Sequence, residues 1–234
     1  MPSADKRARK KENARAAREV REAAFRRKKR TRSMVTVGIV VAIFVGVIVL
    51  LNVTGSDKKK ASSTTSTTTT PTTLDPTKTY TATIKTNLGA FKIAMNTKDA
   101  PIAASHFVEL ARKGVYDGSR WHRVINDFVI QGGAPGGDPS KDYGSSVVGE
   151  VPKGKYAVGD VAAAKTGSAP NGAFDSQFFI VTGPQGVALP PQYADFAHVT
   201  AGMDVVLKIE QLRKGADDDP IRKATIDKVT ITES

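Results

Sequence analysis

The sequence contains no cysteine among its 234 residues. This absence excludes disulfide bonds, thiolate metal sites and a thiol nucleophile. It leaves the compartment open, because exported proteins can fold without disulfides. Histidine is scarce as well, and none of the 3 residues, His106, His122 and His198, has a partner at the spacing of a metal site. We therefore expect neither a metal nor another cofactor.

Acidic side chains are few at the N-terminus of the chain. Residues 1–60 hold 17 Lys and Arg against 5 Asp and Glu, whereas the remainder holds 18 of each charge. The net charge of +12 therefore belongs to the N-terminal part alone. A uniformly basic domain would indicate nucleic-acid binding. Here the body is neutral, so the positive charge indicates only that the tail contacts an acidic partner. We expect no nucleic-acid partner.

Charged side chains are absent from residues 34–53, which read MVTVGIVVAIFVGVIVLLNV. As a helix rising about 1.5 Å per residue, this run is long enough to cross a hydrocarbon core of about 30 Å. A buried core helix would keep a polar face. A cleavable signal peptide would have a shorter apolar run and a small-residue cleavage site. We therefore predict a transmembrane helix.

The two flanks of this helix differ in charge. Residues 1–33 carry 14 Lys and Arg against 4 acidic residues, and the other flank has only Lys58, Lys59 and Lys60. Cytoplasmic flanks carry the positive excess, so residues 1–33 are predicted to be a cytoplasmic tail and the body to lie outside. The chain is then a single-pass protein of the plasma membrane, whose basic tail can contact anionic lipid headgroups.

Residues 54–79 are rich in Ser and Thr and poor in apolar side chains. Such a composition cannot bury enough apolar surface to offset the entropy of ordering, which predicts a disordered linker. The folded domain is predicted to span residues 80–234.

Short alternating runs dominate this domain. Apolar residues alternate on either side of Asn87-Leu88-Gly89, which predicts a hairpin. Pro101 begins a helix that ends at Gly114, and a second helix is predicted from Met203 to about Leu212. Many short strands and two helices indicate an antiparallel β-barrel. The other predicted strands are 121–131, 158–164, 177–182 and 224–232.

Three stretches of the domain resemble the cyclophilin family. They are WHRVINDFVIQGG at Trp121–Gly133, SQFFI at Ser176–Ile180 and FAHVTAGMDVV at Phe196–Val206. The resemblance covers about residues 80–234. It implies a mainly β fold, a closed eight-stranded antiparallel β-barrel capped by two α-helices. It also implies cis-trans isomerisation of Xaa-Pro bonds in proline-containing polypeptides, without a cofactor.

The chemistry of that reaction constrains the residues it needs. Rotation about a prolyl amide costs roughly 18–20 kcal/mol because the nitrogen lone pair is delocalised into the carbonyl. No nucleophile is needed, but a catalyst must favour the twisted amide, whose nitrogen is a better acceptor. The guanidinium of Arg123 suits that role. One charge-assisted hydrogen bond contributes about 1.5–3 kcal/mol, so the fit of the pocket must supply the rest.

The resemblance also implies the remaining site residues. Taken singly, Phe128 and Phe179 would be read as barrel core, since apolar strand residues usually are. Within the two motifs they are expected to contact the proline ring. The implied catalytic residues are Arg123, Phe128 and Gln131, and the implied substrate-binding residues are Val129, Ala164, Gln177, Phe179, Leu189 and Tyr193.

Two further motifs have simpler interpretations. Gly132–Gly137 is rich in glycine but opens no helix and lacks the following Lys, so we predict a turn and no phosphate site. Asp217–Asp219 is interpreted as a solvated loop. The preferred function is an isomerase that accelerates folding of exported or cell-surface proteins. The alternative is a membrane-tethered module that binds proline peptides as a scaffold with little catalysis.

Overall fold

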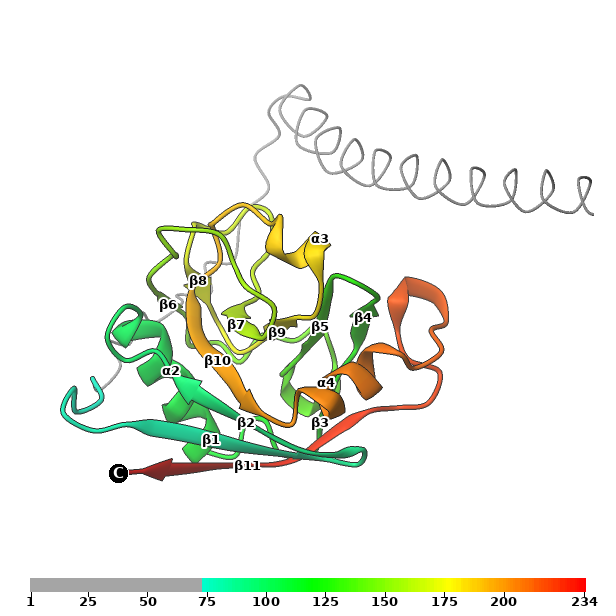
Figure 1. Cartoon of the computed structure of the whole chain (residues 1–234), viewed down its shortest axis with the longest axis horizontal. Coiled ribbons are helices and arrows are strands. Elements are labelled where there is room, and N and C mark those ends of the chain that lie inside the picture. The colour runs from blue at the N-terminus through cyan, green and yellow to red at the C-terminus, as the bar shows by residue number, and fades with distance from the viewer. Residues whose placement is uncertain (1–72) are drawn as a thin grey trace, which may run out of the picture. The chain divides into compact units, whose positions relative to one another are not determined.

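The computed structural model of the chain describes residues 73–234 (Figure 1). The predicted tail 1–33, the predicted membrane span 34–53 and nearly all of the predicted linker 54–79 lie outside these residues. Between residues 73 and 234, no helix is both long and apolar enough to cross a bilayer.

Strands make up most of the regular secondary structure of the described part, which also contains three α-helices and two 3-10 turns. The strands are β1 (Tyr80–Thr86), β2 (Gly89–Met95), β3 (Ser119–Arg120), β4 (Arg123–Ile125), β5 (Val129–Gly132), β6 (Val147–Val148), β7 (Asp160–Ala163), β8 (Ala173–Phe174), β9 (Phe178–Val181), β10 (Asp195–Ala201) and β11 (Thr225–Glu233). The helices are α2 (Pro101–Arg112), α3 (Pro184–Val187) and α4 (Met203–Glu210), and the 3-10 turns are η1 (Pro135–Gly137) and η2 (Ala216–Asp218).

A single curled sheet of 9 strands carries the fold, in the order β3-β11-β1-β2-β10-β7-β9-β5-β4, with β6 and β8 as a separate pair. Every pairing is antiparallel. The mainly β prediction is confirmed, and the sheet is curled, with 9 strands where eight were expected. The end strands β3 and β4 do not pair with each other. They follow each other directly in the chain, and of the two residues between them Trp121 N donates to Ala224 O, next to β11, and His122 N donates to Gln131 O on β5.

The interior of the curled sheet holds the main core. Alternate residues of β1 and β2 point into it, among them Ile84, Phe91 and Ile93, each at most 1% exposed. Helix α2 packs against β10 and β11, and α4 packs against β2, β4 and β5 (Figure 1). The two predicted helices are confirmed, and α3 is a short additional one. The predicted hairpin is confirmed as well, since β1 pairs with β2.

Two boundaries differ from the sequence prediction. The single strand predicted for residues 121–131 is divided into β4 and β5 by a turn, at which Asp127 has a φ of 59°. The core also extends N-terminal to Tyr80. The side chain of Leu74 is 9% exposed, and its backbone N–H donates to Ser105 Oγ at 3.0 Å. Leu74 therefore packs with the domain, although the sequence analysis places it in the linker.

Candidate active site

The sheet is apolar on both faces where the candidate site lies. Along β9, Phe178 and Ile180 belong to the main core, whereas Phe179 and Val181 belong to a second apolar cluster. Successive residues of a strand point to opposite faces, so this split separates the interior from an outer face. Two adjacent phenylalanines therefore have different roles, and only Phe179 lies on the outer face.

The second apolar cluster contains six of the predicted site residues. Its buried members come from β5, β7, β9 and an irregular segment that carries Tyr156, and half-buried side chains pack on them from the flanking loops and α3. Such a surface suits an apolar ring, because the ring can cover apolar side chains that the protein itself covers only in part. The six predicted residues in it are Phe128, Val129, Ala164, Phe179, Leu189 and Tyr193.

A line of three polar side chains runs beside this cluster. Arg123 Nη1 donates to Gln131 Oε1 at 3.4 Å, and Gln131 Nε2 donates to Gln177 Oε1 at 3.2 Å. Gln177 Nε2 donates in turn to Pro139 O at 3.1 Å. The register explains the line, because Arg123 on β4 pairs with Gln131 on β5, which pairs with Phe179 on β9.

Arg123 joins the polar line to the apolar cluster. Its guanidinium carbon lies 5.8 Å from the centroid of the Phe128 ring, within the range of a cation–π contact. The guanidinium is thus held by the Gln131 amide on one side and by an aromatic ring on another. All nine predicted site residues therefore lie in one continuous site.

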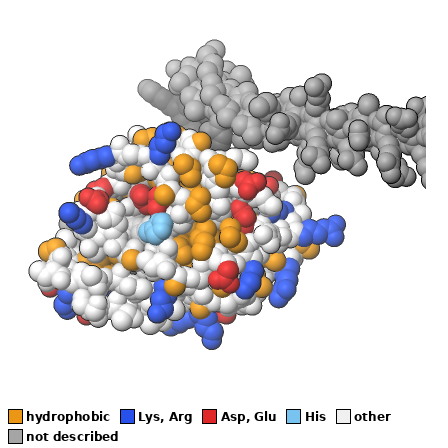
Figure 2. Space-filling model, in the orientation of Figure 1, with side chains coloured by type: hydrophobic (Ala, Val, Ile, Leu, Met, Phe, Trp, Pro, Cys, Tyr) orange, Lys and Arg blue, Asp and Glu red, His pale blue; other side chains and the backbone are white. Residues whose placement is uncertain are grey.

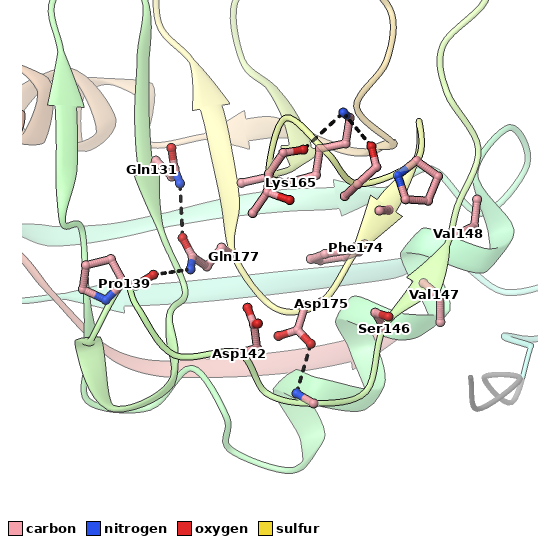
Figure 3. Close-up of a pocket in the computed structure, with 16 residues that line it drawn as sticks. Gln131, Pro139, Asp142, Ser146, Val147, Val148, Lys165, Phe174, Asp175 and Gln177 are labelled. Carbon is pink, nitrogen blue, oxygen red and sulfur yellow. Dashed lines mark hydrogen bonds between the residues drawn. The ribbon is translucent and has the colours of Figure 1, made fainter. Parts of the chain in front are cut away.

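A pocket of about 630 Å³ continues this site away from the apolar cluster. Gln131, Ala164 and Gln177 line both the pocket and the site just described. The other walls come from residues 139–148 and 165–175, and Figure 3 shows the bonded pair Gln131 and Gln177 along one wall. The opening is large enough for side chains that flank a bound ring.

The turn that carries Phe128 is packed closely against the start of α3. A Cβ on Gly183 would lie 2.5 Å from the Asp127 Cα, and one on Gly186 would lie 2.4 Å from the Phe128 carbonyl oxygen. Thr182 N donates to Phe128 O at 2.9 Å. Glycine is required at these two positions for the turn and α3 to approach each other.

Tyr193 is held at the rim by contacts from two sides. Tyr156 Oη donates to Tyr193 O at 2.9 Å and accepts from Tyr193 N at 3.0 Å. Burial raises the pKa of Tyr156 to about 12, so the hydroxyl stays protonated at neutral pH. Lys165 Nζ lies 5.5 Å from the centroid of the Tyr193 ring.

Comparison with known proteins agrees with this geometry. The family model described as cyclophilin type peptidyl-prolyl cis-trans isomerase/CLD matches residues 81–231. The chain belongs to the cyclophilin family. Its domain is therefore a peptidyl-prolyl cis-trans isomerase, as the sequence predicted.

Relatives of the cyclophilin domain come from distant organisms. A peptidyl-prolyl cis-trans isomerase of Helicobacter pylori is 37% identical over 156 residues, which cover 59% of this chain and 91% of that protein. One of Arabidopsis thaliana is 34% identical over 149 residues, covering 62% and 88%. The crystal structure of a Cryptosporidium parvum cyclophilin type isomerase has a TM-score of 0.61 at 28% identity, covering 66% and 98%. A second structure of that protein, with a TM-score of 0.60, was obtained in the presence of the dipeptide Ala-Pro.

Four members of the second apolar cluster were not predicted from the sequence, and one of them is Ala162 on β7. Val181 and Val187 belong to the second apolar cluster, as does Tyr156. Val181 lies two residues beyond Phe179, so the period of the strand would have placed it on the same face. Tyr156 lies in an irregular segment, and no periodic pattern indicates its position.

A half-buried carboxyl group lies beside the apolar cluster of the cyclophilin domain. Asp195 begins β10 and pairs with Ala162, a member of that cluster. Burial and, to a smaller extent, the negative charge of Asp160 together raise the pKa of Asp195 to about 7. Asp160 Oδ1 lies 2.8 Å from Nδ1 of His198. Figure 2 shows apolar side chains gathered on one face of the described residues.

Asp195 is expected to make stability depend on pH. In the unfolded chain its pKa is about 3.9, so between about pH 4 and about pH 7 the unfolded state loses a proton that the folded state keeps. The free energy of unfolding therefore falls across this window, and the loss persists above pH 7. We predict that Asp195→Asn raises the melting temperature of the 73–234 fragment relative to wild type at pH 8, and much less at pH 4. A difference between the two proteins that does not change with pH would contradict this assignment.

Proposed function

We propose that this isomerase acts on Xaa-Pro bonds of exported or cell-surface polypeptides, held at the outer side of the plasma membrane by residues 34–53. The activity follows from the family and the site. The location is supported by the uncharged apolar run and by the excess of positive charge in residues 1–33. The tail 1–33 then lies in the cytoplasm, and residues 54–79 link the membrane to the enzyme.

The substrate proline ring is proposed to lie on the second apolar cluster, against Phe128, Phe179 and Leu189. Phe179 lies on the outer face of the sheet, and the half-buried side chains of Phe128 and Leu189 pack beside it. Covering them with a ring removes apolar surface from water, which contributes about 25 cal/mol per Å². The Ala-Pro dipeptide used with the Cryptosporidium parvum relative supports substrates of this kind.

The observation that carries the mechanism is the position of Arg123 at the edge of the apolar cluster. Its guanidinium is held by Gln131 and Phe128, so little reorganisation is needed when the substrate amide twists. As the prolyl nitrogen loses conjugation, it becomes a better acceptor for an Arg123 N–H. This hydrogen bond strengthens in the transition state and lowers the barrier to rotation.

The glutamine pair fixes the orientation of the polar groups. Gln177 donates to Pro139 O and accepts from Gln131, which leaves the Gln131 oxygen facing Arg123. The oxygen and the nitrogen of each side-chain amide therefore point toward defined partners. Gln131 is proposed to contact the substrate backbone, and the adjoining pocket accommodates residues that flank the proline.

Removal of the guanidinium tests the catalytic role. We predict that Arg123→Ala lowers kcat/KM for an Ala-Pro peptide by about tenfold or more, since a charge-assisted hydrogen bond contributes about 1.5–3 kcal/mol. Arg123→Lys is expected to recover little of this, because lysine keeps the charge and lacks the planar fork. The matched control is Arg112→Ala, an arginine on α2 whose side chain is 51% exposed.

The outcome that would contradict the role is specific. If Arg123→Ala and Arg123→Lys both isomerise the peptide at the wild-type rate in a folded domain, Arg123 does not stabilise the twisted amide. The scaffold interpretation, in which the domain binds proline peptides with little catalysis, would then be favoured.

The proposed topology has its own test in intact cells. A protease added outside is expected to digest the cyclophilin domain and to leave residues 1–33 intact, because the membrane shields the cytoplasmic tail. Antibodies against tags placed at each end of the chain would report the two fragments. Digestion of the tail with protection of the domain would reverse the topology.

A further inference from the structure

We propose that Glu210 is a positioning residue for the isomerase reaction, which holds the turn at Asn126–Phe128 and thereby the support of Arg123. Glu210 is far from the substrate motifs in the sequence and does not belong to the apolar cluster or the polar line. The proposal rests on the catalytic role of Arg123 described above.

The placement of Glu210 runs against two local preferences. It is the last residue of α4, where the helix dipole disfavours an acidic side chain. It is also only 6% exposed, although burial of a carboxyl group is costly without a partner. Its neighbours Val206 and Ile209 form the buried apolar face of the helix, which an apolar residue at position 210 would extend. Helix formation and packing therefore do not explain a glutamate here.

The partner of the Glu210 carboxyl group is the backbone of the turn. Asp127 N donates to Glu210 Oε1 at 2.9 Å, across 83 positions of sequence. Asp127 has a φ of 59°, a left-handed conformation that residues other than glycine rarely adopt. The bond satisfies an N–H that no strand partner reaches, and so it stabilises this conformation.

A second side chain near the end of α4 contacts the same turn. Lys214 Nζ donates to Asn126 Oδ1, and it also donates to the Glu210 carbonyl oxygen at 2.6 Å. The helix α4 packs against β4 and β5, the strands on either side of the turn (Figure 1). Glu210 and Lys214 therefore fix the turn from the side of α4.

The opposite side of the turn is fixed by the segment that begins α3. Gln185 N donates to Asp127 O at 3.0 Å, and Thr182 N donates to Phe128 O at 2.9 Å. The turn is thus bonded on both sides, directly before the Phe128 ring that contacts the Arg123 guanidinium. Without the bond to Glu210, Asp127 would no longer be held in its left-handed conformation. The Phe128 ring would then no longer be held in a fixed position against the Arg123 guanidinium. Displacements of about 1 Å at such groups can lower rates by up to about a hundredfold.

Two substitutions in the full-length chain separate the acceptor from the volume of the side chain. Glu210→Met keeps the volume but cannot accept from Asp127, and we expect it to lower kcat/KM by about fivefold or more, with the larger change in kcat. Glu210→Gln keeps an acceptor oxygen and is expected to stay within about twofold of wild type. The matched control is Asp117→Leu, which removes a similar carboxyl bond to Val229 N on β11, away from the site, and should leave activity unchanged.

Several outcomes would overturn the positioning role. Wild-type activity of Glu210→Met would do so, and so would an equal loss in Glu210→Gln. Hydrogen exchange at the Asp127 amide of the wild-type protein gives a readout that does not depend on folding of the Met variant. Slow exchange supports the hydrogen bond to Glu210, and exchange at the rate of a free amide would show that the bond is absent. If Arg123→Ala lowers activity while Glu210→Met does not, only the positioning role fails. If Arg123→Ala is itself active, the proposed mechanism fails, and the exchange rate still tests the bond.

Discussion

The register of β4, β5 and β9 is the constraint on which the site depends. It sets Arg123 opposite Gln131 and Gln131 opposite Phe179, so a polar line forms beside an apolar surface. A slip of one residue in β5 would turn Ile130 outward and Gln131 into the core. The same slip would cost the core an isoleucine and remove the partner of Arg123. Stability and catalysis therefore select the same register.

A sheet that is apolar on both faces normally needs a second layer to cover it. Here the outer face carries Phe179 and Val181, and loops, α3 and a tyrosine pair cover it only in part. The uncovered part is where the proline ring is proposed to bind. Departures from local preference occur around it, since Glu210 is a buried acidic residue, Asp195 is a half-buried one with a raised pKa, and Asp127 has a positive φ. Such departures are expected where function competes with stability.

The sequence predicted those parts of the site that lie within continuous motifs. Arg123, Phe128 and Gln131 share one string, and the resemblance of that string to the family indicates their place in the site. The turn between β4 and β5 was missed because Asp127 takes a conformation that usually requires glycine. Glu210 could not be found from its own helix, because its partner lies 83 positions away. The division between β3 and β4 was missed for a similar reason, since only the amides of Trp121 and His122 show where the chain passes from one strand to the other.

The central claim is that Gln131 and Arg123 act as one unit on the twisted amide. A double-mutant cycle on kcat/KM tests this most directly, with Gln131→Ala made in wild type and in Arg123→Ala. The account predicts strong coupling, of about 0.5–3 kcal/mol, because Gln131 has less to orient once the guanidinium is gone. Gln131→Ala should then cost activity in wild type and far less in the Arg123→Ala background. Equal factors in both backgrounds would show that the two side chains act independently and would contradict the account.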